Sequence, residues 1–222
     1  MTAASRPVSE GILRAQLCDL LRLFYANGWV TGTGGGICTV LTPDTLLMAP
    51  TGVHKERVRP SDLFIVNRKD GTVHRRPAHP ALRLTECQSI FRLLVNQAGA
   101  GSVMHSHALS AVLAADIARG NDCVIVEGLE MLKGVRGATN ADKHPIPVIH
   151  NTAREPELLS QIGAVVETGA FSGSFCILVR DHGAYIWGAD VWEAKRHAEV
   201  YHFLFEAMRA RSRYNTKEAK GE

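Results

Sequence analysis

The sequence predicts one α/β domain in which helices cover both faces of a mainly antiparallel or mixed central sheet, a three-layer α/β/α arrangement. Helical apolar spacing occurs at both ends of the chain and again between short apolar runs. Several of these runs are separated only by turn residues, as in β-hairpins. The 222 residues suit one large domain, and no repeat or internal linker divides them. We place the domain at residues 8–211 and expect flexible termini at residues 1–7 and 212–222.

The first third of the chain predicts a helix followed by short strands. The helix has apolar residues at helical spacing after a candidate cap at Ser9, and it ends at Asn27-Gly28. Asp70-Gly71 is expected to close a hairpin. Apolar runs bounded by proline and aspartate turns predict strands at residues 37–41, 45–49 and 63–67.

The rest of the chain alternates between helices and strands. Predicted helices cover residues 86–97, 108–118, 155–167 and 190–211. Predicted strands cover residues 102–105, 123–126, 146–149, 175–179 and 184–187. Helices placed between strands favour packing on both sides of a sheet, whereas the order of the strands does not follow from the sequence. We expect His197 and His202 to lie on the exposed side of the last helix and His144 to lie at the surface.

The composition excludes several classes of function. A net charge of +3, from 25 Lys+Arg against 22 Asp+Glu, is too small and too dispersed to predict nucleic-acid binding. No run approaches the roughly 18 apolar residues that a membrane span needs. The first residues lack the apolar core of a secretion signal, and five cysteines without a Cys-x-x-Cys pair fit a cytoplasmic protein with reduced thiols. The ten histidines are the one unusual count, and they direct attention to a metal.

His105-Ser106-His107 is the sharpest chemical feature of the sequence. Positions i and i+2 of a strand point to one face, so these two imidazoles can share one metal ion. Zinc takes at least three protein ligands, usually nitrogen or sulfur, and His182, in a predicted turn between two strands, is the natural third. Taken alone, the pair is equally compatible with two surface histidines at the end of a strand.

Two glycine-rich segments could bind an anion. In residues 31–36, Thr-Gly-Thr-Gly-Gly-Gly, the glycines let backbone N–H groups approach closely and the threonines add hydroxyl donors. The segment is not a P-loop, because no Gly-Lys-Ser/Thr follows, and not a Rossmann fingerprint, because Ile37 stands where a glycine is needed. Thr51-Gly52 repeats the same chemistry, and Lys55 could supply charge. On residue types alone, two tight turns explain both segments more simply.

Two carboxylates and one thiol are further candidates. Glu86 opens the predicted helix that precedes the histidines, and Glu130 lies within the segment Leu-Glu-Met-Leu-Lys-Gly. A glutamate near a metal can serve as a general base or as a fourth ligand. A solvated glutamate is the commoner case, and Cys87 would ordinarily be a small core residue.

Taken together, these motifs resemble the zinc-dependent class II aldolase/adducin family from about residue 17 to residue 208. The matching segments are GWVTGTGGGI, APTGVHKERV, GAGSVMHSH, LEMLKG and VRDHGAYIWG. The first, second and fourth are particular to the eukaryotic-type dehydratases of that family. The resemblance implies a class II aldolase-like fold, one Zn²⁺ per subunit, and a homotetramer with its sites at subunit boundaries.

The residues of the family site carry over to this chain motif by motif. The resemblance implies zinc ligands at His105, His107 and His182 and a catalytic acid/base at Glu130. It also places Cys87 in the substrate pocket. The other residues expected to bind substrate, chiefly its phosphate, are Thr31, Gly32, Thr33, Gly34, Gly35, Thr51, Gly52, Lys55 and Thr85.

Glu86 is a departure from the dehydratase pattern. It stands nineteen residues before His105, where the aldolase branch of the family has its metal-linked acid/base glutamate. A dehydratase of this type need not keep a carboxylate there, so Glu86 is a fourth ligand, a second base or a bystander. The aldolase branch also has a Ser-Ser pair for phosphate just before that glutamate, and Leu84-Thr85 keeps one of the two hydroxyls.

The resemblance implies a lyase that converts 5-methylthioribulose 1-phosphate into 2,3-diketo-5-methylthiopentyl 1-phosphate, a step of methionine salvage. The partner is then a phosphorylated sugar, with no role for nucleic acid or membrane. Two alternatives stay open. A class II sugar-phosphate aldolase or epimerase would use the same metal, and Glu86 favours it. A non-catalytic, adducin-like interaction module would keep the fold without the chemistry.

Overall fold

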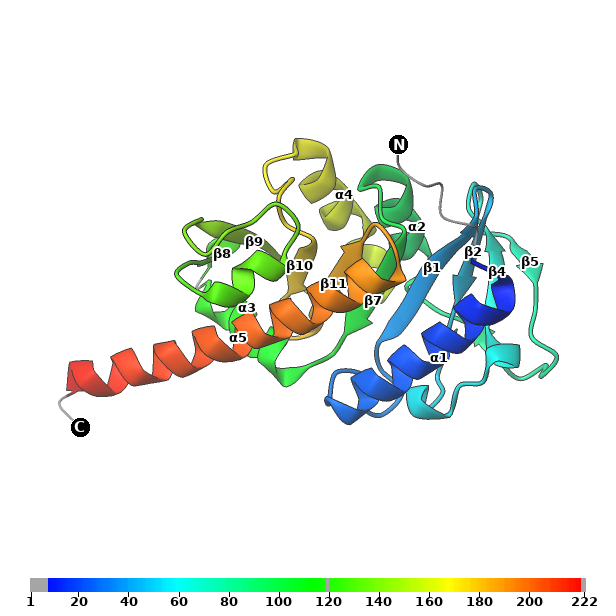
Figure 1. The fold of residues 1–222 in the computed structure, drawn as a ribbon, viewed down its shortest axis with the longest axis horizontal. Coiled ribbons are helices and arrows are strands. Elements are labelled where there is room, and N and C mark those ends of the chain that lie inside the picture. Colours follow the sequence, from blue (N-terminus) through cyan, green and yellow to red (C-terminus); the bar gives the residue numbers. More distant parts are fainter. Residues whose placement is uncertain (1–7, 119, 221–222) are drawn as a thin grey trace.

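The computed structural model describes residues 8–118 and 120–220 and has the predicted α/β fold (Figure 1). The predicted N-terminal tail, residues 1–7, lies outside the described residues. The α-helices of the described part are α1 (Glu10–Ala26), α2 (Gln88–Gln97), α3 (Leu109–Ile117), α4 (Leu159–Thr168) and α5 (Val191–Lys220). Among the described residues, none of the helices carries an apolar stretch long enough to cross a membrane.

Nine strands of the described part form one mixed sheet in the order β5-β4-β2-β1-β7-β11-β10-β9-β8. Neighbouring strands are antiparallel except β9 and β10, which are parallel. The strands are β1 (Gly36–Thr42), β2 (Thr45–Met48), β4 (Phe64–Asn67), β5 (Val73–Arg75), β7 (Ser102–Ser106), β8 (Cys123–Val126), β9 (His144–Ile149), β10 (Cys176–Val179) and β11 (Gly183–Gly188). A separate two-stranded sheet pairs β3 (Pro50–Thr51) with β6 (Arg83–Leu84). The predicted mainly antiparallel or mixed sheet is confirmed.

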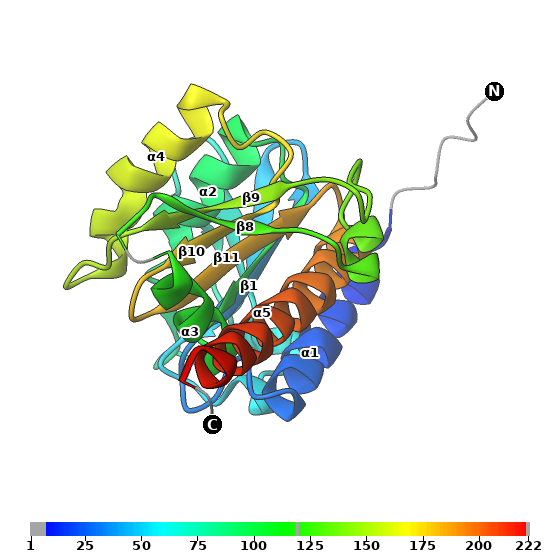
Figure 2. The ribbon, with the colours of Figure 1, turned by 90° about the vertical axis from the view of Figure 1, so that its left-hand side faces the viewer.

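Helices cover both faces of the large sheet, as predicted. Helices α1, α3 and α5 lie on one face, and α2 and α4 pack together on the other (Figure 2). Strands β7 and β11 run through the middle, and every residue of both is buried. The predicted cap of α1 is present, because the Ser9 hydroxyl accepts a hydrogen bond from the backbone N–H of Ile12.

The helix predicted over residues 155–167 begins differently in the structure. A 3₁₀ turn, Glu155–Leu158, precedes the α-helix that starts at Leu159. Pro156 explains the difference, since proline lacks the N–H of a helix interior and fits only the first turn. Glu155 therefore lies on a short, separately oriented turn at the edge of the sheet rather than on the helix itself.

The last helix is longer than predicted. It continues beyond Arg211 to Lys220, so the predicted end of the helix at Arg211 is wrong. The stretch is polar, which suggests a loose end, but it contains good helix formers and no glycine or proline before Gly221. These turns of α5 extend away from the rest of the fold (Figure 1).

Three histidines expected at the surface are buried instead. His202 is 1% exposed, stacks on Trp29 and lies 2.7 Å from the Ser106 hydroxyl through Nε2. His197 is fully buried, with Nδ1 2.7 Å from a backbone carbonyl oxygen of β11. His144 is also buried and contacts the hydroxyl of Tyr201 on α5. Two of these histidines lie on the α5 face that packs on β7 and β11, so they are structural residues of the interior.

The buried histidines predict that the protein loses stability in mild acid. Burial lowers the pKa of His202 to about 4, whereas an unfolded histidine takes up a proton near pH 6.5. Between these values the unfolded chain binds more protons, so the free energy of unfolding falls as the pH falls. His202 alone should account for about 2 kcal/mol between pH 7 and pH 4.5. Urea unfolding at several pH values measures this loss.

A His202→Gln variant should show a smaller loss over the same pH range, by about 2 kcal/mol. A matched control is His74→Gln, because His74 is exposed and its substitution should leave the pH dependence unchanged. If His202→Gln had the same pH dependence as the wild type, protonation of this ring would not be the cause.

Candidate metal centre

The three predicted histidines converge because of how β7 pairs with β11. The strands are antiparallel, with His105 opposite Tyr185 and Ser106 opposite Ala184, so β7 ends beside the turn that leads into β11. His105 and His107 leave the end of β7 on one face, and His182 lies in that turn. The three Nε2 atoms lie 2.9, 3.1 and 3.2 Å from one another.

The tight turn before β11 depends on one glycine. Gly183 lies so close to β7 that a Cβ atom at this position would stand 1.9 Å from the Ser106 carbonyl oxygen. Only glycine permits this approach. The preceding residue, His182, is thereby held against the end of the strand that carries the other two rings.

The protonation state of the histidine rings leaves Nε2 atoms free to bind a cation. His105 Nδ1 lies 3.1 Å from the Ala184 carbonyl oxygen, and His182 Nδ1 lies 3.0 Å from the Asn151 Oδ1 atom. Because both oxygens only accept hydrogen bonds, each Nδ1 carries the proton in a neutral ring and each Nε2 carries a lone pair. Burial, together with the two neighbouring rings, lowers the pKa of His107 to about 3, so its ring is neutral at physiological pH.

The facing Nε2 lone pairs of His105 and His182 repel each other unless they share a positive ion. In a tetrahedral site with metal–nitrogen distances of 2.0–2.1 Å, neighbouring ligand atoms lie roughly 3.3 Å apart. The observed separations of 2.9–3.2 Å are close to that value. The donor set therefore fits a divalent metal ion.

A fourth side chain, Glu155, joins the three histidines. Its Oε1 atom lies 3.6 Å from His105 Nε2 and 3.8 Å from His182 Nε2, and one ligand atom from each of the four residues falls within 4.8 Å of the others. Burial alone would raise the pKa of Glu155, but the neighbouring rings of His105 and His182 and the hydrogen bond from the Cys87 thiol hold this pKa below its usual range. The carboxylate is therefore ionised in the interior.

Sequence reasoning missed Glu155. The residue lies just past β9, which is parallel to β10, so the ends of these two strands lie at the same edge of the sheet. His182 follows β10 directly, and Asn151 and Glu155 follow β9. Only the order of the strands reveals this neighbourhood, and no motif in the sequence marks it.

The glycine-rich segment packs directly on the histidines. A Cβ atom at Gly34 would stand 2.5 Å from His107 Nδ1, and one at Gly35 would stand 2.7 Å from the His105 carbonyl oxygen. Lys55 is buried beside it and donates hydrogen bonds to the carbonyl oxygens of Thr33 and Val53, at 2.7 and 3.3 Å. Residues 31–36 therefore have a structural role, because they pack against His105 and His107.

The second predicted loop and the residues near Cys87 border the same region. Thr51 pairs with Arg83 in the small two-stranded sheet. The buried Thr85 hydroxyl accepts a hydrogen bond from the backbone N–H of Cys87 at 3.3 Å. The Cys87 thiol in turn donates to Glu155 Oε2 at 2.5 Å. The structure thus brings together most of the residues predicted to bind substrate.

Two predicted carboxylates do not join the centre within this chain. Glu86 is exposed in the turn before α2, because its neighbour Cys87 is the residue that points inward. Glu130 is exposed on a 3₁₀ turn, Glu130–Gly134, and pairs with Lys133 at 2.7 Å. This turn follows β8, whose end lies beside the start of β9, so Glu130 leaves the sheet at the edge opposite to the metal centre.

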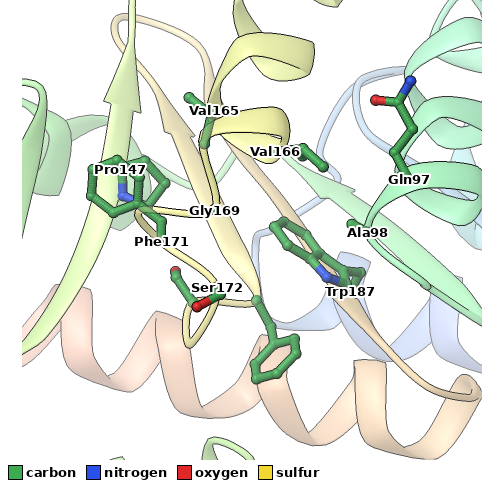
Figure 3. Close-up of a pocket in the computed structure, with 11 residues that line it drawn as sticks. Gln97, Ala98, Pro147, Val165, Val166, Gly169, Phe171, Ser172 and Trp187 are labelled. Atoms are coloured by element: carbon green, nitrogen blue, oxygen red, sulfur yellow. The ribbon is translucent and has the colours of Figure 1, made fainter.

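A cavity of about 210 Å³ lies away from the metal centre. It is found where β10 begins and β11 ends, whereas His182 lies where β10 ends and β11 begins (Figure 3). Its apolar lining includes Val165, Val166, Phe171, Phe175 and Trp187. No residue that lines this cavity has an ionisable side chain, so it offers neither metal ligands nor an acid/base.

Gly34 provides a direct test of the packing on His107. A Gly34→Ala substitution should push the His107 ring out of position, because the added methyl group has no room beside Nδ1. We expect metal affinity, measured by calorimetric titration of the metal-free protein, to fall at least about tenfold. Gly173→Ala is the matched control, since a Cβ atom there meets nothing within 4 Å. Wild-type affinity in Gly34→Ala would contradict this account of the loop.

Comparison with known proteins agrees with this geometry. Residues 15–208 match the family model described as Class II Aldolase and Adducin N-terminal domain. A methylthioribulose-1-phosphate dehydratase of Gallus gallus is 37% identical over 195 residues, which cover 85% of this chain and 78% of that protein. A protein of Physcomitrium patens named "Probable bifunctional methylthioribulose-1-phosphate dehydratase/enolase-phosphatase E1" is 39% identical over 207 residues, covering 88% of this chain and 40% of that protein.

The fold is also similar to a solved structure. The crystal structure of L-fuculose-1-phosphate aldolase from Thermus thermophilus superimposes with a TM-score of 0.63 at 20% sequence identity, covering 96% of this chain and 99% of that one. This likeness concerns the fold, whereas the family match extends over most of the sequence. The chain therefore belongs to the class II aldolase and adducin family.

Proposed function

We propose that this protein is a cytoplasmic, zinc-dependent hydro-lyase that removes water from 5-methylthioribulose 1-phosphate to give 2,3-diketo-5-methylthiopentyl 1-phosphate in methionine salvage. The observation that carries the proposal is the convergence of His105, His107 and His182 on one point. Support comes from the similarity to relatives named as methylthioribulose-1-phosphate dehydratases. A set of three imidazoles and one carboxylate is typical of zinc.

The reaction needs a proton to leave the carbon beside a ketone, so negative charge develops on the oxygens of the substrate. A zinc ion held by the three imidazoles supplies Lewis acidity that stabilises such charge. The chain's own residues hold this site in shape. The Ala184 carbonyl and the Asn151 amide orient two of the rings through Nδ1.

The phosphate of the substrate would bind at the two glycine-containing loops beside the metal centre. The donors would be the Thr51 hydroxyl and backbone N–H groups of residues 31–35, except that of Gly34, which donates to the Thr31 carbonyl oxygen. Lys55 adds a buried positive charge next to them. Binding energy from this remote group fixes the reacting carbons relative to the centre. Cys87, whose thiol is buried beside Glu155, lines the pocket.

The catalytic acid/base in this proposal is Glu130, supplied by a neighbouring subunit of a homotetramer. Within one chain Glu130 leaves the sheet at the edge opposite to the triad, and it is exposed. An exposed carboxylate can reach the centre of another copy when the sites lie at subunit boundaries. This arrangement reconciles the predicted role of Glu130 with its position in the fold.

A sugar-phosphate aldolase or epimerase is the second candidate. The fold likeness to L-fuculose-1-phosphate aldolase and the carboxylate of Glu155 beside the triad both fit that chemistry. A non-catalytic module is less well supported, because four ionisable side chains converge in the interior without any evident structural need.

Incubation with candidate substrates separates these functions. The dehydratase should consume 5-methylthioribulose 1-phosphate and give the diketone, whereas fuculose and ribulose phosphates should stay intact. Release of a three-carbon phosphate by retro-aldol cleavage would favour the aldolase.

His182→Ala should retain less than about a tenth of the bound metal and lose activity with it. His74→Ala, at an exposed histidine, is the control, and full metal occupancy in His182→Ala would refute the triad.

Glu130→Gln tests the acid/base. The variant should keep its metal, because Glu130 lies apart from the triad, and lower kcat at least about a hundredfold, the usual scale for a lost acid/base. Glu127→Gln is the matched control, since Glu127 is an exposed carboxylate three residues away. Near-normal turnover in Glu130→Gln would remove this residue from the mechanism.

A further inference from the structure

Glu155 stands where a fourth ligand of the metal centre would stand. The three Nε2 atoms form a triangle with edges of 2.9–3.2 Å. Glu155 Oε1 lies 3.6 Å from one corner and 3.8 Å from another, only a few tenths of an ångström longer than the roughly 3.3 Å edge of a tetrahedral zinc site. The carboxylate oxygen therefore lies close to the fourth vertex.

The second oxygen of Glu155 is already held by a neighbour. The Cys87 thiol donates a hydrogen bond to Oε2 at 2.5 Å, which leaves Oε1 directed at the histidines. Cys87 is itself buried and fixed, since its backbone N–H donates to the Thr85 hydroxyl. A hydrogen bond to one oxygen orients the other, which is how outer-shell groups commonly position a ligand.

The loop that follows β9 serves the centre twice. Asn151 accepts the Nδ1 proton of His182 at 3.0 Å, and Glu155, four residues on, faces the same ring at 3.8 Å. Glu157, by contrast, points outward and pairs with Arg154 at 2.8 Å. Only one carboxylate of this 3₁₀ turn is therefore built into the site.

Tyr185 packs against the same group of residues. The ring of Tyr185 stacks on His105 at 4.1 Å between ring centroids, almost parallel to it. The Tyr185 hydroxyl is buried beside Cys87 and Glu155 and interacts with both side chains.

We propose that Glu155 is the fourth ligand of the metal centre in the substrate-free protein and that Cys87 is its positioning residue. The inference rests on the proposed function only in requiring that the three histidines hold a metal. A catalytic centre must leave one coordination position for its substrate, so Glu155 occupies in the resting state the position that the substrate needs. The carboxylate that the sequence suggested for this role, Glu86, is exposed on the outer side of Cys87.

Cobalt binding to the metal-free protein tests the ligand assignment, because the visible absorption of Co²⁺ depends on its ligands. Glu155→Gln should bind Co²⁺ at least about tenfold more weakly than the wild type and should change its absorption spectrum. Glu157→Gln, the matched control two residues away, should behave like the wild type. Wild-type affinity and spectrum in Glu155→Gln, or a larger loss in Glu86→Gln, would overturn the proposal.

Two further measurements keep the test decisive if Glu155→Gln is unstable. Thermal unfolding of each metal-free variant shows whether the fold is intact. In Glu155→Ala, added acetate should restore part of the Co²⁺ affinity by filling the vacated position, and no effect of acetate in a folded variant would count against the proposal.

The role of Cys87 is tested by a conservative pair. Cys87→Ala should weaken Co²⁺ binding severalfold, and Cys87→Ser, which keeps a hydrogen-bond donor, should restore it. Equal affinity in all three proteins would remove Cys87 from the positioning role.

The His182→Ala variant separates this inference from the proposed function. If that variant bound Co²⁺ normally, the assignment of the three histidines as ligands would be wrong, whatever the role of Glu155.

Discussion

The site depends on three histidine nitrogens that face one another closely enough to share one cation. His105 and His182 each give their Nδ1 proton to an oxygen, so their Nε2 lone pairs face each other at 3.2 Å. His107 closes the triangle as a neutral ring, because burial lowers its pKa. The rings stay there because β7 and β11 are central, fully buried strands whose register brings the three rings to one point. The scaffold thus holds an arrangement that would be unfavourable without its ion, and this is the mark of a functional site.

The glycine-rich loop shows how one segment can satisfy two requirements. Gly34 must be glycine because the His107 ring occupies the place of its Cβ atom, and Gly35 adopts a left-handed backbone conformation against β7. The same lack of side chains exposes backbone N–H groups, which suits an anion. The buried ammonium of Lys55 ties the loop down through the Thr33 carbonyl oxygen, and burial lowers its pKa. Packing on the three histidines and the proposed recognition of phosphate are therefore compatible requirements for the sequence of this loop.

The sequence predicts those features of the site that depend on local residue patterns. The alternation of a strand puts His105 and His107 on one face, and turn residues put His182 between two strands, so the triad could be expected. Glu155 could not, because its place depends on β9 being parallel to β10, and strand order is a long-range property. The burial of His197 and His202 was predictable in part: each is three or four residues from the buried Ala194, Ala198 or Tyr201 on the same helix face, and this spacing outweighs the polarity of the ring.

The positions of the two glutamates divide the proposed function between one chain and its assembly. Glu155 and the histidines belong to one chain, so the proposed metal centre is complete within a single copy. Glu130 leaves the sheet at the opposite edge, so the proton transfer proposed for it would need a second copy. Metal occupancy and turnover can then be lost separately, the first by a change near β7 and β11 and the second by a change in subunit contacts. Such a division explains why a carboxylate that is solvent-exposed in the single chain can still serve a buried reaction, since burial of the site would be completed only when the subunits meet.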